Sequence, residues 1–92
     1  MQDLLAEYID LLHWAEGSTR RAEDRASYRA LLAGAAVLLA RAVKGADAGA
    51  LRSLVEAHER RRGQTRLRGA EHGVVEQAWA RVRAAASDQA AT

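Results

Sequence analysis

The chain has 92 residues, with 14 lysine or arginine and 12 aspartate or glutamate, and it contains no cysteine, proline or phenylalanine. This length fits a single domain, and an apolar fraction of 49% is typical of a chain that folds. The lack of cysteine excludes disulfide scaffolds, cysteine zinc sites and thiol catalysis.

The absence of proline and a 3.6-residue repeat of apolar side chains predict helices punctuated by glycine. The four predicted helices cover about residues 3–16, 18–44, 47–62 and 70–86. Ser18 or Thr19 is the expected N-cap of the second helix and Asp47 that of the third, and residues 86–92 are expected to fray. The predicted fold is all-α: one domain over residues 1–92, a compact bundle of about four helices with a long central second helix.

Three of these helices carry a single apolar stripe, which is assigned to the core. The stripe residues of the first, third and fourth helices are Leu4, Leu5, Tyr8, Ile9, Leu11, Leu12 and Ala15; Leu51, Leu54 and Val55; and Val74, Val75, Ala78, Trp79 and Val82.

The second helix has two apolar faces. One holds large side chains, from Tyr28 to Val43, and the opposite face holds small ones, including Ala30, Ala33, Val37 and Ala40. Two interpretations are open. The helix is buried on both sides at the centre of the monomer, bending at Gly34, or the small residues form a self-association face of a homodimer.

The sequence favours a cytoplasmic protein without a membrane partner. Its start is acidic where a signal peptide would be basic. The longest uninterrupted apolar run, residues 30–40, is shorter than the roughly 20 residues that a membrane span needs.

Charge is unevenly distributed. Residues 1–17 carry four carboxylates and no lysine or arginine, whereas five arginines gather at the end of the third helix: Arg60, Arg61, Arg62, Arg66 and Arg68. Guanidinium groups bind phosphates and carboxylates through a fork of donors. The cluster therefore predicts a solvated helix end, a site for an acidic protein partner or a nucleic-acid site.

Trp14 lies opposite the apolar stripe of the first helix, on the face that carries Asp3, Glu7 and Asp10. A tryptophan exposed on an acidic face is a typical anchor of a protein interface. The alternative is that Trp14 folds under the start of the second helix or under the chain end.

The histidines give no complete metal site. His13 follows Asp10 by three residues and His72 precedes Glu76 by four, so each pair shares a helix face. The Glu-x-x-His pattern that bundles repeat on two helices is missing. We therefore expect surface ion pairs, no metal and no cofactor.

The segment Ala57-His58-Glu59-Arg60-Arg61-Arg62-Gly63 resembles the histidine-phosphotransfer motif, which lies in a four-helix bundle of about this size. The resemblance implies a phosphoaccepting role for His58. Two features depart from the family: the glycine follows the histidine by five residues instead of four, and His58 is in line with Leu51, Leu54 and Val55 on the core side.

No nucleophile motif or phosphate-binding loop is present, so the chain is not expected to be an enzyme. The leading expectation is a non-enzymatic interaction module, of adaptor, regulator or inhibitor type, that self-associates and docks a larger protein partner. Trp14 and the five clustered arginines are the expected partner-binding residues. The alternatives are a nucleic-acid-associated regulator working through Arg60 to Arg68 and, third, phosphotransfer through His58.

Overall fold

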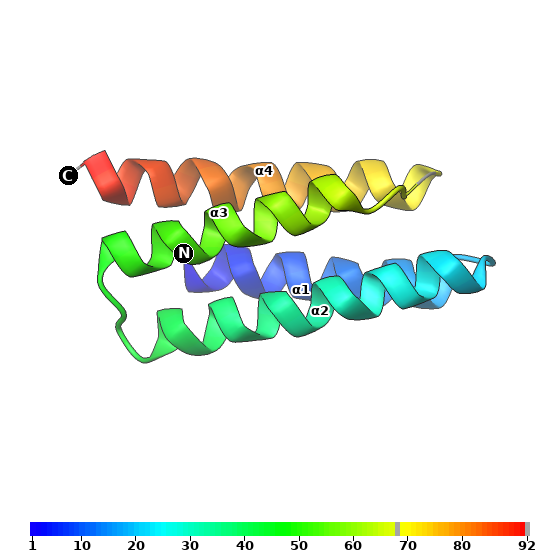
Figure 1. The fold of residues 1–92 in the computed structure, drawn as a ribbon, viewed down its shortest axis with the longest axis horizontal. Coiled ribbons are helices and arrows are strands. Elements are labelled where there is room, and N and C mark those ends of the chain that lie inside the picture. Colours follow the sequence, from blue (N-terminus) through cyan, green and yellow to red (C-terminus); the bar gives the residue numbers. More distant parts are fainter. Residues whose placement is uncertain (68, 92) are drawn as a thin grey trace.

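A computed structural model of the chain describes the backbone of residues 1–67 and 69–91 and the side chains of these residues up to 88. It contains four helices, drawn in Figure 1: α1 (Gln2–Ser18), α2 (Ala22–Val43), α3 (Ala48–Gln64) and α4 (Ala70–Ala91). The prediction of an all-α four-helix bundle is confirmed.

Short loops make neighbouring helices antiparallel. α1 packs against α2 and α4, and α3 packs against the same two helices, so the bundle is a square array with α1 and α3 on one diagonal. The molecule measures 41 × 21 × 20 Å, and both termini lie at the end that carries the α2–α3 loop (Figure 1).

The second helix is long, as predicted, but it is not central. α2 and α4 have 22 residues each, and α2 occupies one corner of the square. α4 continues to Ala91, through residues that were expected to fray. Alanine, the strongest helix former, is frequent in this stretch. Thr92 lies outside the described residues.

Two of the predicted helix boundaries have the expected chemistry. Asp47 caps α3, since its side chain accepts a hydrogen bond of 2.8 Å from the Ala50 N–H. α2 ends in a Schellman motif at Gly45, whose φ of 78° is one that glycine adopts without strain. In this motif the N–H groups of Gly45 and Ala46 bond to the carbonyls of Ala42 and Arg41.

The predicted start of the second helix was wrong. α2 begins at Ala22, after Arg21 as its N-cap residue, and neither Ser18 nor Thr19 caps it. Ser18 instead completes α1, and Thr19 is extended with ψ of 143°. The chain needs these residues to turn between two antiparallel helices.

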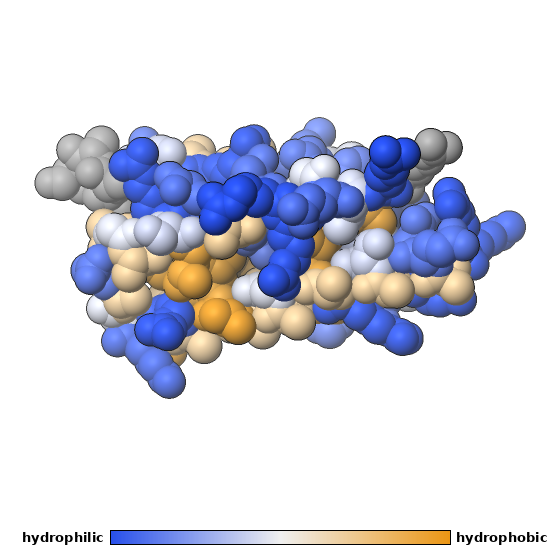
Figure 2. Space-filling model, viewed as in Figure 1, coloured by the Kyte–Doolittle hydropathy of each residue, from blue (hydrophilic) through white to orange (hydrophobic). Residues whose placement is uncertain are grey.

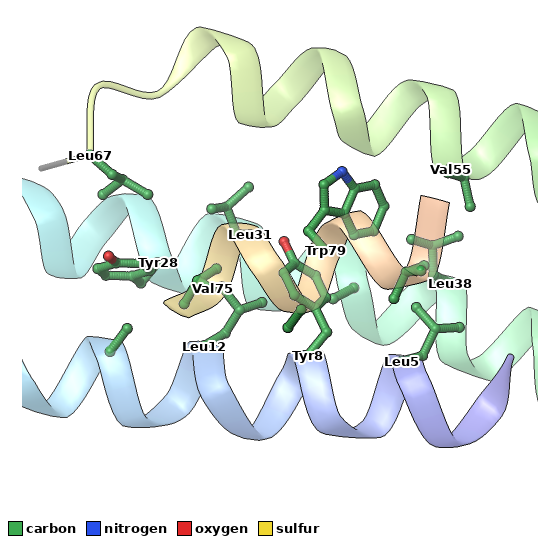
Figure 3. Packing of buried hydrophobic residues seen from close by; sticks show 14 of the residues in the cluster. Leu5, Tyr8, Leu12, Tyr28, Leu31, Leu38, Val55, Leu67, Val75 and Trp79 are labelled. Carbon is green, nitrogen blue, oxygen red and sulfur yellow. The ribbon is translucent and has the colours of Figure 1, made fainter. Parts of the chain in front are cut away.

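The core runs along the bundle axis and takes residues from all four helices (Figure 3). Its largest fully buried side chains are Leu5, Tyr8, Leu12, Tyr28, Leu31, Leu38, Val75, Trp79 and Val82. Every one of them belongs to a predicted stripe. Two large stripe residues are exposed instead: Val74 on α4, and Val43 at the C-terminal end of α2.

By length and composition alone, α2 is apolar enough to cross a membrane, which the count of uninterrupted apolar residues had not indicated. This is weak support for a membrane span, since the core helix of a soluble protein meets the same criterion. α2 contributes Tyr28, Leu31 and Leu38 to the core, and its remaining apolar residues are mostly small and exposed.

Candidate functional site

A buried polar cluster crosses the diagonal of the bundle between α1 and α3. The Tyr8 hydroxyl lies 2.8 Å from Nε2 of His58 and accepts a hydrogen bond of 3.0 Å from Nη1 of Arg62. The side chains of Tyr8, His58 and Arg62 are all buried. In Figure 3 the Tyr8 hydroxyl points away from α1 towards α3.

α4 completes this polar cluster from the other side. The second amino group of Arg62 bonds to Glu76, and the indole N–H of Trp79 donates to Glu59. The Trp79 ring also packs against Tyr8 and His58, with ring centroids 5.0 and 4.7 Å away. The buried charge of Arg62 is thus paired and hydrogen-bonded, as burial of a charge requires.

Burial shifts the pKa values of His58 and Tyr8 in the directions that disfavour their charged forms. It lowers the pKa of His58 to about 4, with the positive charges of Arg62 and Arg61 acting in the same direction. Burial also raises the pKa of Tyr8 to about 12, against the opposing charge of Arg62. At neutral pH both side chains are therefore uncharged.

Arg62 differs from the other arginines of the predicted cluster. It was expected at a partner surface, but only 7% of it is exposed. Successive helical residues point about 100° apart, so three consecutive arginines face three directions. The spacing of Leu51, Val55, His58 and Arg62 places Arg62 on the core face, and this spacing is the signal that could have identified it.

The remaining arginines do not share one face. Arg60 is exposed on the side of α3 that faces α4, Arg61 lies on the side of α2, and Arg66 is exposed in the loop before α4. Arg68 lies outside the described residues. Among those residues, the arginines predicted to act together are therefore dispersed over different sides of α3 and its loop.

The seam between α2 and α3 contains an open hollow of about 300 Å³. Its walls are apolar, formed by Ala33, Val37, Leu38, Leu54 and Ala57. His58 and Arg61 also line it, and both reach Gly34 of α2. A Cβ atom at residue 34 would lie 2.9 Å from Nδ1 of His58 and 3.4 Å from Nη1 of Arg61.

The small-residue face of α2 is exposed. Ala30, Ala33, Val37 and Ala40 all face away from the core, and 53% of Val37 is accessible. Figure 2 shows this side of the molecule, with weakly hydrophobic surface along α2 and more strongly hydrophobic surface in the seam with α3. The interpretation that the helix is buried on both sides within the monomer is therefore wrong.

Trp14 is exposed on α1, with 46% of its surface accessible, and does not fold under α2. Of the four carboxylates near it in sequence, Glu7 pairs with Arg81 of α4 and Glu16 with Arg29 of α2, both at 2.6 Å. The acidic character of α1 is thus partly neutralised by its two neighbours.

The histidines offer no metal cluster: within the described part of the chain no three metal-binding side chains come together. His72 and Glu76 share a face as predicted, with 3.9 Å between Nε2 and Oε2. His58 lies on the core side, also as predicted. Its Nε2, occupied by the Tyr8 hydroxyl, is poorly placed to receive a phosphoryl group from another protein.

Comparisons with protein-family models, with curated proteins and with solved structures return no match.

Proposed function

We propose that this protein is a non-enzymatic interaction module that associates with a second copy of itself through the small-residue face of α2. The observation that carries the proposal is the exposure of Ala30, Ala33, Val37 and Ala40 in one stripe opposite the core. A soluble helix normally exposes polar residues on that side.

The chemistry of this face suits contact between two helices. Alanine side chains let helix backbones approach closely, and Val37 supplies the one large apolar group at the middle of the stripe. A two-fold axis at that position would pack the stripe against its own copy, so a single surface serves both partners. Association would also remove apolar surface from water in a small domain with a modest core.

Light scattering after size-exclusion chromatography tests this proposal at tens of micromolar protein. We expect a dimeric mass for the wild type and a monomeric mass for Ala30→Glu and Ala40→Glu, since each places a charge in the contact. Ala84→Glu is the matched control, because Ala84 is an exposed alanine on α4. A wild-type protein of monomeric mass throughout this range would refute self-association.

The docking of a larger protein partner is the second half of the proposal, and the exposure of Trp14 supports it. Large aromatic side chains supply much of the binding energy at interfaces, and an exposed one has no packing role to explain it. Partner capture by the tagged protein should be lost in Trp14→Ala and retained in Val74→Ala, a control at another exposed apolar residue. Equal capture by wild type and Trp14→Ala would remove Trp14 from the binding surface.

A further inference from the structure

We propose that the hollow between α2 and α3 binds a small organic carboxylate, held by Nδ1 of His58 and the guanidinium of Arg61. This goes beyond the proposed function, since it assigns a ligand site to polar groups that self-association does not use.

Hydrogen bonding in the polar cluster fixes which nitrogen of His58 carries the proton. Arg62 can only donate, so the Tyr8 oxygen accepts from it. Among the described residues, Nε2 of His58 is the one acceptor beside the buried Tyr8 O–H, so the O–H donates to Nε2 and is not left unpaired. A neutral imidazole whose Nε2 accepts carries its proton on Nδ1. Only 5% of His58 is exposed. Its Nδ1–H is therefore a buried donor that points towards Gly34 and the hollow.

A second donor converges on the same point. Nη1 of Arg61 and Nδ1 of His58 both lie within 3.5 Å of the position that a Cβ of residue 34 would take, so both donors lie on the same side of Gly34, in the hollow that they line. Within the described residues, no carboxylate lines the hollow and Arg61 has no ion pair. The site thus presents two donors and a positive charge without an acceptor.

The rest of the hollow defines the other half of the ligand. Apolar side chains form its walls, and its volume of about 300 Å³ is at the lower end of small-molecule sites, roughly 300–1,000 Å³. A carboxylate joined to a short aliphatic chain matches both parts: its oxygens accept from His58 and Arg61, and its chain covers Leu54 and Ala57 on the α3 side of the hollow.

Hexanoate is a suitable probe, with hexanamide as its neutral counterpart of nearly the same shape. We would titrate each into ¹⁵N-labelled protein at pH 7 and follow the Gly34 amide and the imidazole of His58 by NMR. Hexanoate should shift both signals to saturation and bind roughly ten-fold more tightly than hexanamide, because charge-assisted hydrogen bonds are the stronger ones. Equal affinities would overturn the proposal, since the hollow would then bind apolar chains without recognising the carboxylate.

Two variants make the assignment specific. Arg61→Gln should weaken hexanoate binding about ten-fold or more, whereas Arg60→Gln, which removes a neighbouring exposed charge, should leave it unchanged. Retention of affinity in Arg61→Gln would refute the site. Repeating the titration in Ala40→Glu separates this result from self-association, because Ala40 belongs to the α2 face but does not line the hollow.

Discussion

His58 makes the stability of the protein sensitive to acid. Its pKa is about 4 in the folded chain and near 6.5 when unfolded. Between these values the unfolded chain binds a proton that the folded chain does not, so acid favours unfolding. We expect the free energy of unfolding to fall by on the order of 3 kcal/mol from this residue between pH 7 and pH 4.

Urea unfolding of wild type and His58→Gln at pH 7, 5.5 and 4 measures this contribution. Carboxylates lose their ion pairs in acid in both proteins, so the difference between the two pH dependences isolates the histidine. Parallel curves would show that His58 titrates normally and that its burial has no such consequence.

The two buried tyrosines should respond differently to loss of the hydroxyl group. Tyr8→Phe leaves Arg62 and His58 each without one buried hydrogen bond, which should cost about 1–3 kcal/mol. Tyr28→Phe should be neutral or slightly stabilising, because the Tyr28 hydroxyl is buried without a partner in the described part of the chain. Chemical denaturation of both variants checks the contrast, and similar losses would contradict the central role of the Tyr8 hydroxyl.

At the scale of elements, the ring of His58 from α3 packs against the α2 backbone at residue 34, where glycine leaves room for it. In a helix interior, alanine is normally more stable than glycine by about 1 kcal/mol. In Gly34→Ala the new Cβ would lie 2.9 Å from His58, whose ring is held by Tyr8 and packed against Trp79. We therefore expect a net destabilisation of about 1–3 kcal/mol.

Gly73→Ala provides the control for this substitution. Gly73 lies in α4, and nothing is within 4 Å of its added Cβ. It should stabilise the protein by about 0.5–1 kcal/mol through helix propensity and a less flexible unfolded chain. Thermal unfolding of the two variants should shift in opposite directions. A stabilised Gly34→Ala protein would mean that the two helices tolerate a wider separation.

At the scale of the whole molecule, the arrangement of arginines bears on nucleic-acid binding. The net charge is only +2, Arg62 is internal, and Arg60 and Arg61 diverge around α3. Binding along a phosphate backbone requires several cations on one surface. We expect no measurable change in the anisotropy of labelled duplex DNA or single-stranded RNA at low micromolar protein and about 150 mM salt.

The same titration at about 50 mM salt completes this test. Tight binding that collapses as salt rises would contradict the expectation and make the exposed arginines the centre of a nucleic-acid function. Substitution of Arg60 and of Arg66 should then each reduce the slope of log affinity against log salt concentration by about one unit in magnitude.

Helix periodicity accounts for what could be predicted of the fold and the site. It identified the four helices and their large, fully buried side chains, because burial of an apolar stripe depends on local spacing. It did not identify Leu67, which reaches the core from the loop between α3 and α4. The prediction that Arg60, Arg61 and Arg62 share one surface was wrong, because successive residues of a helix point about 100° apart and Arg62 is buried. The same spacing already placed His58 on the core face, and extended by four residues it also places Arg62 there.

The sequence by itself determined the class of fold, the core faces of the helices, the Asp47 cap and the glycine end of α2, since each depends on interactions within a few residues. The tertiary structure alone decided how the helices share their surfaces. It set Tyr8 of α1 beside His58 and Arg62, which are 50 and 54 residues away in the chain, and it left one face of α2 exposed. Such pairings depend on which helices become neighbours, and the apolar stripes of a four-helix chain do not specify that choice.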